Sequence, residues 1–224
     1  MNSGKNKMII ASCPLRVSLL GGSTDLEDFI NHYGSGQVIS FPVNLYTYVS
    51  INKRYDGKFL IQYSEIESVT EISKIKNDLV RVVLEYFNIS THITVALNAD
   101  IPSHGSGLSS SSSFMIAMIK ATSKFKEIEL SDYEICELAL VGRQDPLGCG
   151  LKGFKHLEFN HNKKTKITPF SNSYFKKFDL YLIPISEKGR KSTTILKSLD
   201  LKERKLIYDK VEKGIEYLNR KEYK

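Results

Sequence analysis

Apolar and polar residues alternate through much of the first hundred residues, which predicts β-strands. Residues 43–52 show the pattern most clearly, and the residues that share one face there are Val43, Leu45, Thr47, Val49 and Ile51. Shorter strands are expected at residues 8–13, 15–20, 58–63 and 91–97, with Pro14 between the first two. A turn at residues 55–57 would let 58–63 pair with 43–52 as a hairpin.

Apolar residues three and four positions apart predict helices elsewhere in the chain. The expected helices are residues 24–33, 75–87, 114–125, 131–140, 192–199 and 202–220. Ser131 as N-cap, with Glu134 three residues later, is the signature of a capping box. More strands are expected at 154–160, 166–170 and 178–183, whereas the glycine-rich segment 142–153 is expected to be irregular. Strands and helices in this order indicate an α+β fold.

Composition adds that the chain is an ordinary globular protein, because 41% of its 224 residues are hydrophobic and 25% are charged. No apolar run approaches the length of a membrane helix, and the polar residues 1–8 lack the apolar stretch of a signal peptide. Cys13, Cys136 and Cys149 are odd in number and have no metal-like spacing. We therefore expect free, buried thiols and a cytoplasmic location.

The net charge of +7 does not indicate a nucleic-acid partner. The last 23 residues hold eight Lys/Arg and five Asp/Glu, which is typical of a solvated helix face rather than a basic arm. No aromatic and basic motif of the common nucleic-acid modules is present. A basic balance suits the handling of phosphorylated small molecules equally well.

The most informative segment for function is residues 100–113, DIPSHGSGLSSSSS, which follows a predicted strand and precedes a predicted helix. Glycines let the backbone approach a ligand closely, and the start of a helix offers unpaired N–H groups to an anion. Serine hydroxyls add donors for phosphate oxygens, but no lysine follows in the Walker pattern. A flexible linker is the alternative, although linkers seldom separate a strand from a strongly apolar helix.

Several motifs in register resemble those of the GHMP kinases. Residues 102–113 resemble the motif P-x-x-x-G-L-G-S-S of that family, and residues 14–25, PLRVSLLGGSTD, resemble the P-x-R-x-x-x-x-G-G-G-T-D of its heptose 7-phosphate kinase-like sugar kinases. Residues 142–159 resemble G-(K/R)-Q-D-Q-x-x-A-x-x-G-G-x-N-x-x-E-F, and residues 189–196 are a fainter match to T-R-x-A-x-x-I-L. The resemblance implies a GHMP kinase N-terminal domain (ribosomal protein S5 domain 2-like) at residues 8–185, followed by the beginning of a C-terminal domain at 186–224.

The resemblance also implies which residues would bind ATP and Mg²⁺. The phosphates would lie against Pro102, Gly105, Ser106, Gly107, Leu108, Ser109, Ser110, Ser111 and Ser112. The metal would be held by Ser111 together with Glu134 or Glu137, which lie three positions apart and therefore on one face of a helix. The sequence does not choose between the two glutamates.

For catalysis, the resemblance implies Asp145 as the group that takes the proton of a sugar hydroxyl, and Arg16 as a second catalytic residue. A carboxylate next to Arg143 is expected to be ionised, although the two could instead form a structural ion pair at a turn. The residues expected to meet the sugar are Arg16, Gly22, Thr24, Asp25, Arg143 and Arg190. Asp25 could alternatively be no more than a first-turn acid of the helix at 24–33.

Three departures qualify this interpretation. Ser109 replaces the second glycine of G-L-G, Lys152 replaces a glycine of the later motif, and only four residues separate Glu137 from Gly142. The family's third glycine-rich motif is not found, so the chain is interpreted as truncated at its C-terminus. The leading hypothesis is a sugar kinase acting on a heptose or hexose derivative, at the anomeric hydroxyl. The alternatives are a non-catalytic nucleotide- or sugar-phosphate-binding protein and a kinase for a mevalonate-like acid.

The last predicted helix carries an apolar stripe, formed by Leu206, Ile207, Val211, Ile215 and Leu218. Such a stripe needs a surface to cover it. We expect a second copy of the chain or another polypeptide to supply that surface. The alternative is that the helix packs on the sheet of its own chain.

Overall fold

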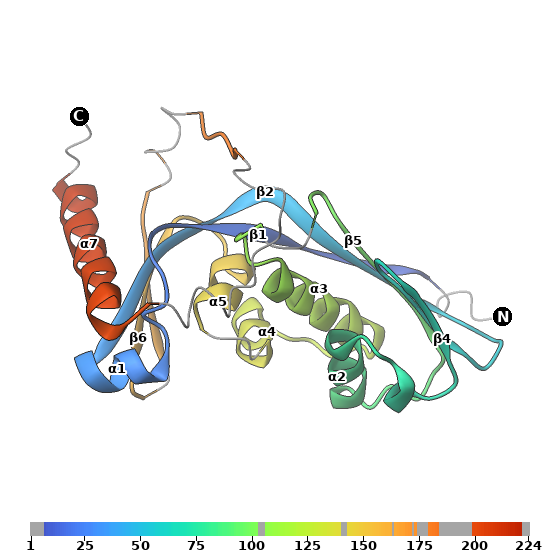
Figure 1. Ribbon diagram of the computed structural model, residues 1–224. Helices are drawn as coiled ribbons and strands as arrows, with labels where there is room; N and C mark the ends of the chain where they lie inside the picture. Colours follow the sequence, from blue (N-terminus) through green and yellow to red (C-terminus); the bar gives the residue numbers. More distant parts are fainter. Residues whose placement is uncertain are drawn as a thin grey trace.

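The computed structural model shows an α+β fold, as the sequence predicts (Figure 1). It describes residues 7–102, 106–139, 143–162, 164–171, 173, 179–183 and 199–220. The described strands form a seven-stranded sheet of β1 (Ile9–Gly21), β2 (Ser35–Lys53), β3 (Phe59–Gln62), β4 (Ile66–Val69), β5 (Ile93–Ala99), β6 (Lys155–Asn160) and β7 (Thr165–Pro169). Their order is β4-β3-β5-β2-β6-β7, and β1 pairs with β2.

The long strand β2 organises the sheet. It pairs antiparallel with β1 along most of its length, with β6 through residues 35–40 and with β5 through residues 47–53. The alternation seen in the sequence is confirmed, because Thr47, Val49 and Ile51 are fully buried on one face.

One predicted pairing is wrong. β3 does not pair with β2 across the turn at residues 55–57; it runs parallel to β5 and antiparallel to β4. The reason is that β5 occupies the edge of β2 that a hairpin would have used. β5 brings Ile93 and Val95, both fully buried, into the centre of the sheet.

The helices are α1 (Glu27–Tyr33), α2 (Asp78–Tyr86), α3 (Ser110–Phe125), α4 (Asp132–Leu138), α5 (Gln144–Gly150) and α7 (Leu201–Arg220), with a short 3-10 helix at Ile72–Lys74. Helices α2 to α5 cover one face of the sheet (Figure 1). The main core lies between these helices and the sheet, and it includes Val49, Ile51, Val95, Ile116 and Leu157.

Two element predictions need correction near the predicted site. The first helix begins at Glu27 rather than Thr24, because the Thr24 side chain bonds to the backbone of Gln37 in β2 and does not cap a helix. Residues 144–150 form helix α5, although the glycine content of the segment predicted an irregular structure.

The strand predicted at 178–183 is also wrong, because residues 179–183 form no strand. Most of the helix predicted at 192–199, and the proposed domain boundary after residue 185, lie outside the described residues.

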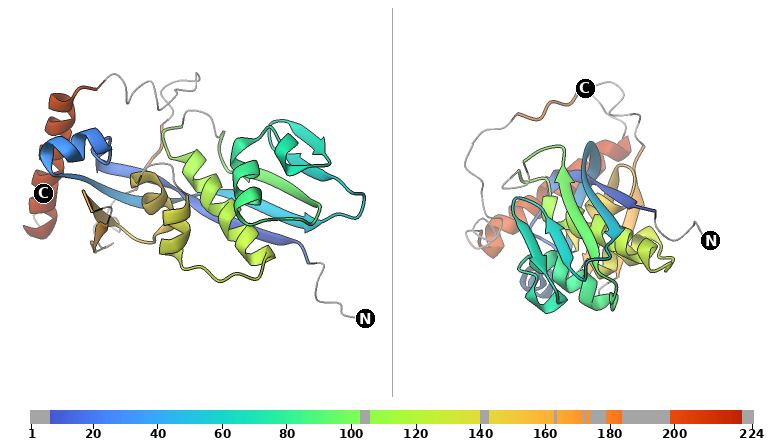
Figure 2. Two further views of the ribbon diagram at one scale, coloured as in Figure 1. Left: turned by 90° about the horizontal axis from the view of Figure 1, so that it is seen from below. Right: turned by 90° about the vertical axis from the view of Figure 1, so that its right-hand side faces the viewer.

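Helix α7 packs on the sheet face opposite to α3 and α5. Ile39 and Phe41 of β2 point to that face, where they form a second cluster with Phe154 and Val211, and Ile215 and Leu218 pack against it. Figures 1 and 2 show α7 at the end of the sheet opposite to β4. Val211, Ile215 and Leu218 of the apolar stripe are thus covered by the sheet of their own chain, as the alternative had it, whereas Leu206 is 65% exposed. Self-association stays a prediction.

Cys13, Cys136 and Cys149 are free and buried, as predicted. Burial raises the pKa of Cys13 to about 11 and that of Cys136 to about 12, and it also raises the pKa of Cys149. Such thiols are inert at neutral pH. Among the described residues, no helix has both the length and the apolar character needed to cross a membrane.

Candidate active site

The serine-rich loop ends at an uncapped helix start. Helix α3 has sixteen residues, and its N-cap, Ser109, makes no side-chain capping bond. The N–H groups of Ser110, Ser111 and Ser112 fall in the first turn, where an α-helix offers no backbone acceptor. Gly107 has φ of 72°, and an added Cβ would meet none of the described residues within 4 Å. Donors and open space thus lie together, which is what an approaching anion requires.

The serines of this loop differ in their roles. The hydroxyl of Ser106 accepts from the amide of Leu108 and lies 3.2 Å from that of Ser110. Ser113 is fully buried, and its hydroxyl donates to the carbonyl of Cys13 in β1. Ser112 is buried, whereas Ser111 is exposed. The loop is therefore tied to the sheet at its far end, while the side chain of Ser111 is accessible.

Ser109 adopts the left-handed conformation that the motif assigns to glycine. Its φ is 62° and its ψ is 41°. A side chain costs roughly 1–2 kcal/mol in this region. Its hydroxyl oxygen is also buried and finds no hydrogen-bond partner among the described residues. The departure noted in the sequence therefore falls on a position where the backbone favours glycine.

We predict that Ser109→Gly stabilises the protein by about 1 kcal/mol, because it removes both the left-handed strain and the unpaired hydroxyl. Thermal unfolding should show a rise of roughly 2–4 °C for a chain of this size. Glu127→Gly is the matched control, since Glu127 is also left-handed, with φ of 57°, but exposes its side chain. A Ser109→Gly protein that is less stable than the wild type would show that the hydroxyl has a structural role.

Arg16 joins the loop to Asp145, which lies 129 residues further along the chain. Its Nη2 and Nε donate to Oδ1 of Asp145 at 2.5 and 3.2 Å, and its Nη1 donates to the carbonyl of Gly107 at 2.9 Å. The backbone amide of Arg16 donates to the carbonyl of Leu108. The Arg16 side chain is 11% exposed and that of Asp145 is 37% exposed. The carboxylate of Asp145 is therefore partly accessible, and Arg16 links it to the serine-rich loop in one cluster, the Arg16–Asp145 cluster.

Asp25 also lies near Asp145, but its carboxylate accepts hydrogen bonds from the backbone at the start of α5. Its Oδ2 accepts from the amides of Arg143 and Gln144 at 3.3 and 3.2 Å, at the start of α5. Burial raises the pKa of Asp25, and the charge of Asp145 raises it further, while the two backbone hydrogen bonds act in the opposite direction. Asp25 is therefore an N-terminal cap for the helix that carries Asp145, not a first-turn acid of α1.

The other expected sugar contacts are arranged differently. Thr24 is fully buried, and its hydroxyl both donates to and accepts from the backbone of Gln37. Gly22 has φ of 132° and lies beside the side-chain amide of Gln144. Thr24 therefore shapes the loop, and its hydroxyl is already paired.

The alternative of a structural ion pair between Arg143 and Asp145 is not observed, because the ion-pair partner of Asp145 is Arg16. Arg143 instead donates from Nη1 to the carbonyl of Asn160 in β6. Gly105 and Arg190 lie outside the described residues.

The two candidate glutamates lie on α4. The capping box is confirmed: the carboxylate of Glu134 accepts from the amide and hydroxyl of Ser131. The adjacent Asp132 pairs with Lys120, which stands ten residues into α3 from Ser110. Glu137 is exposed. Burial raises the pKa of Tyr133, and the negative charge of Glu137 raises it further. The structure does not bring either glutamate into the Arg16–Asp145 cluster.

Two residues at the cluster have no counterpart in the sequence prediction. Gly148 lets α5 lie against Arg16, since a Cβ there would be 3.1 Å from Cγ of Arg16. Lys155 is fully buried beneath the end of α5. Lys155 shares one strand face with the apolar Leu157 and Phe159, which was the available signal, but its partners are backbone groups, which no sequence pattern reveals.

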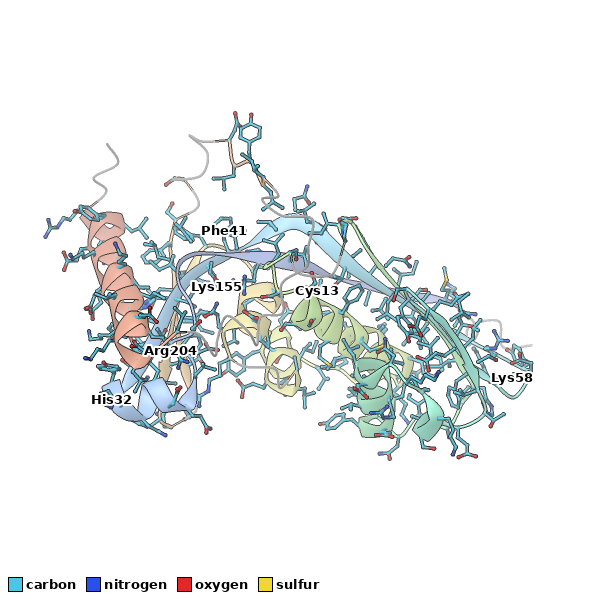
Figure 3. The ribbon with its side chains drawn as sticks, viewed as in Figure 1. Cys13, His32, Phe41, Lys58, Lys155 and Arg204 are labelled. Atoms are coloured by element: carbon cyan, nitrogen blue, oxygen red, sulfur yellow. The ribbon has the colours of Figure 1, made fainter. Side chains whose placement is uncertain are left out.

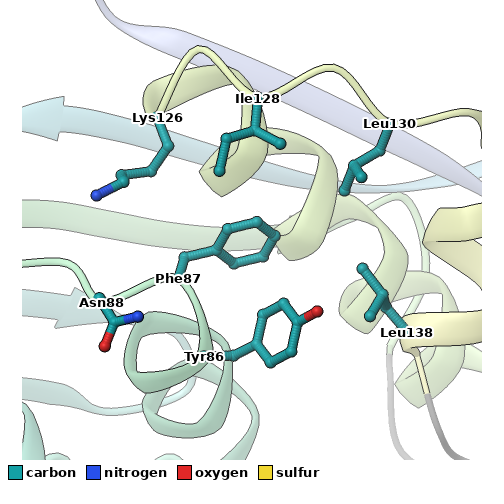
Figure 4. Close-up of a pocket in the computed structure, with 7 residues that line it drawn as sticks. All are labelled: Tyr86, Phe87, Asn88, Lys126, Ile128, Leu130 and Leu138. Atoms are coloured by element: carbon teal, nitrogen blue, oxygen red, sulfur yellow. The ribbon is translucent and has the colours of Figure 1, made fainter.

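A hollow lies far from the Arg16–Asp145 cluster. It is lined mainly by apolar residues, namely Tyr86, Phe87, Asn88, Lys126, Ile128, Leu130 and Leu138 (Figure 4). These residues surround the C-terminal end of α3, whereas the serine loop stands at its N-terminal end. The hollow is therefore separate from the candidate active site.

Comparison with known proteins agrees with this geometry. Residues 74–152 match the family model described as the GHMP kinases N terminal domain, a range that runs from α2 to the end of α5. The chain therefore contains a GHMP kinase N-terminal domain.

Within that family, the chain is similar to a D-glycero-alpha-D-manno-heptose 7-phosphate kinase of Campylobacter jejuni, with 30% identity over 185 residues, 73% of this chain and 54% of the relative. The chain spans about half the length of the curated relatives it matches.

Solved structures share the fold. A D-glycero-D-manno-heptose 1-phosphate kinase from Bacteriodes thetaiotaomicron superposes with a TM-score of 0.65 at 24% identity, over 75% of this chain and 61% of that one. A mevalonate kinase superposes with a TM-score of 0.66 at 21% identity, over 94% of this chain and 72% of that one. The second alignment extends over almost the whole chain.

Proposed function

We propose that this protein is an ATP-dependent sugar kinase, which transfers the γ-phosphoryl group of ATP to the anomeric hydroxyl of a heptose 7-phosphate or a related sugar. The observation that carries the proposal is the position of Arg16, which contacts both the carboxylate of Asp145 and the carbonyl of Gly107. A potential general base and a potential phosphate cradle thus lie side by side. The similarity to the Campylobacter jejuni kinase supports the choice of sugar.

In this proposal, the first-turn amides of α3 and the open backbone at Gly107 bind the phosphates of ATP. The sugar hydroxyl attacks the γ-phosphorus, the bond to the β–γ bridging oxygen breaks, and ADP leaves. Asp145 accepts the proton that the hydroxyl releases. Arg16 places a positive charge beside the transferring group, and phosphoryl transfer depends mainly on such positioning and charge neutralisation.

Mg²⁺ fits this site as a companion of ATP. Among the described residues, no group of three or more His, Cys, Asp or Glu side chains could hold a metal ion. Mg²⁺ usually keeps several waters and takes few protein ligands when substrate phosphates are present. We propose the exposed hydroxyl of Ser111 as its protein ligand, in place of Glu134 and Glu137, which do not reach the cluster. When bound, the ion would neutralise charge on the β- and γ-phosphates.

For the sugar, we propose contacts with Gly22, Arg143 and Arg190, whereas Asp25 and Thr24 support the loop around it. Arg143 has one N–H engaged with the carbonyl of Asn160, and a guanidinium carries five. The remaining donors suit a phosphate group on the substrate.

One observation favours a second candidate function. Ser109 adds a side chain, at a strained left-handed position, where a phosphate would approach the start of α3 most closely. A protein that binds nucleotide or sugar phosphate without turnover would tolerate this change. Measuring ADP release over a panel of sugars and sugar phosphates, with Mg-ATP as donor, separates the two functions, because only the kinase shows sugar-dependent turnover.

Nucleotide titration tests the loop directly. We expect Gly107→Val to weaken Mg-ATP binding about tenfold, because a β-branched residue at φ of 72° is strained by roughly 1–2 kcal/mol and fills the space left for the phosphates. Gly57→Val is the matched control: Gly57 has the same φ and the same open surroundings, in a turn between β2 and β3. Equal affinity in wild type and Gly107→Val would remove the loop from the site.

A further inference from the structure

The helix that carries Asp145 is weak by sequence. Helix α5 has seven residues, QDPLGCG, two of which are glycines in its second half. Glycine is among the poorest helix formers, and a helix this short is not stable by itself in water. Contacts from outside the helix must therefore hold it in place.

Close packing explains why the glycines are there. A Cβ on Gly148 would lie 3.1 Å from Cγ of Arg16, and one on Gly150 would lie 2.3 Å from Sγ of Cys136. The helix can approach Arg16 and α4 only because these side chains are missing. Glycine at these two positions also lowers the intrinsic preference of the segment for a helix. The helix must therefore be held by contacts at its two ends.

The N-terminal end is fixed by the carboxylate of Asp25, and the C-terminal end by Lys155. The Nζ of Lys155 donates to the carbonyl oxygens of Gly148, Leu151 and Gly153 at 3.2, 2.7 and 3.2 Å. Lys155 is 1% exposed, and Figure 3 labels it beside α5. The last carbonyls of a helix lack partners within the helix, and a cation there is favourable. Lys155 thus supplies from β6 what the end of α5 lacks.

We propose that Lys155 is a positioning residue for Asp145: by fixing the C-terminal end of α5, it keeps the carboxylate at the opposite end in contact with Arg16. The proposal rests on the proposed kinase function for the catalytic importance of Asp145. It does not follow from the motif resemblance, in which asparagine stands at the position of Lys155.

The cost of burying its charge indicates that Lys155 is not simply filling space. Burial lowers the pKa of Lys155 to about 8, so its surroundings disfavour the charged form. The titratable groups that face Lys155 are the thiols of Cys149 and Cys136. A methionine would fill the same volume without this cost. The ammonium group has three N–H donors, and the structure gives it three carbonyl acceptors.

Two variants separate a donor role from a packing role. Lys155→Met keeps the volume and removes every donor, while Lys155→Gln keeps two N–H donors without the charge. Lys164→Met, at an exposed lysine in the turn between β6 and β7, is the control. For each protein we would measure kcat, KM for ATP, and hydrogen exchange of the peptide that covers α5.

We expect Lys155→Met to lower kcat about tenfold or more, since small misplacements of a catalytic group have effects of this size, with KM for ATP within about twofold of the wild type. Exchange of the α5 peptide should become faster. Lys155→Gln should have a higher kcat and slower exchange of α5 than Lys155→Met. If Lys155 served only for packing, Lys155→Met would be closer to the wild type than Lys155→Gln in both measurements.

Unchanged exchange of α5 in Lys155→Met overturns the proposal, whatever the activity. If the wild type turns over no sugar, the proposed function fails, while exchange still decides whether Lys155 holds the helix. If exchange becomes faster but kcat is unchanged, Lys155 holds α5 without positioning Asp145, and the proposal fails.

Discussion

Replacing Asp145 by asparagine should lower kcat by about 100-fold or more, while the affinity for Mg-ATP changes little. A general base contributes a factor of this order, and the amide cannot accept the proton of the sugar hydroxyl. The change keeps the size of the side chain, and the amide oxygen can still accept from Arg16, so the position of α5 should be preserved. Asp145 is linked to the serine-rich loop only through Arg16, so we expect this change to have little effect on nucleotide affinity.

Steady-state kinetics with the preferred sugar, combined with nucleotide titration, would check this result. Asp132→Asn is a suitable control, because Asp132 pairs with Lys120 on the surface and is remote from the cluster. Unfolding temperatures of the three proteins would show whether the fold is retained. An Asp145→Asn protein with the turnover of the wild type would falsify the assignment of Asp145.

The largest effect on stability is expected from Gly36→Ala, which should destabilise the protein by about 3 kcal/mol, the upper end of the usual cost of overpacking. A Cβ at Gly36 would lie 1.7 Å from the carbonyl oxygen of Thr24, so the loop leading to Asp25 would have to move. Because Asp25 caps α5, the displacement should also reduce kcat.

Denaturant unfolding monitored by circular dichroism gives the free energy of unfolding for this test. Gly57→Ala is the comparison, with φ of 72° and nothing within 4 Å of the added Cβ. It should cost about 1 kcal/mol from backbone strain alone. Equal losses in the two variants would mean that the contact between Gly36 and Thr24 does not constrain the loop.

The sequence predicts the elements whose pattern is local. The alternation in residues 43–52 and the capping box at Ser131 follow from neighbouring residues, and both are confirmed. The substitution at Ser109 could also be recognised as a departure from a glycine position, and the structure shows the left-handed backbone there.

Features that depend on distant parts of the chain could not be predicted. The hairpin between β2 and β3 is plausible from the turn alone, but β5, some forty residues later, occupies the edge of β2. The ion pair of Asp145 joins residues 129 positions apart, whereas the sequence alone suggested only the neighbouring Arg143 as an alternative partner. Helix α5 escaped prediction because its stability comes from Asp25 and Lys155 at its ends rather than from its own residues.

Arg16 couples the serine-rich loop to the part of the site that contains Asp145. One of its nitrogens holds the carbonyl of Gly107 and another holds Asp145, so a ligand that displaces either acceptor changes the free energy available to the other. Such coupling between two binding equilibria is reciprocal by necessity. In the proposed kinase, whatever factor ATP imposes on the affinity for the sugar, the sugar imposes the same factor on the affinity for ATP, and Arg16 is the side chain through which we expect the two to be coupled.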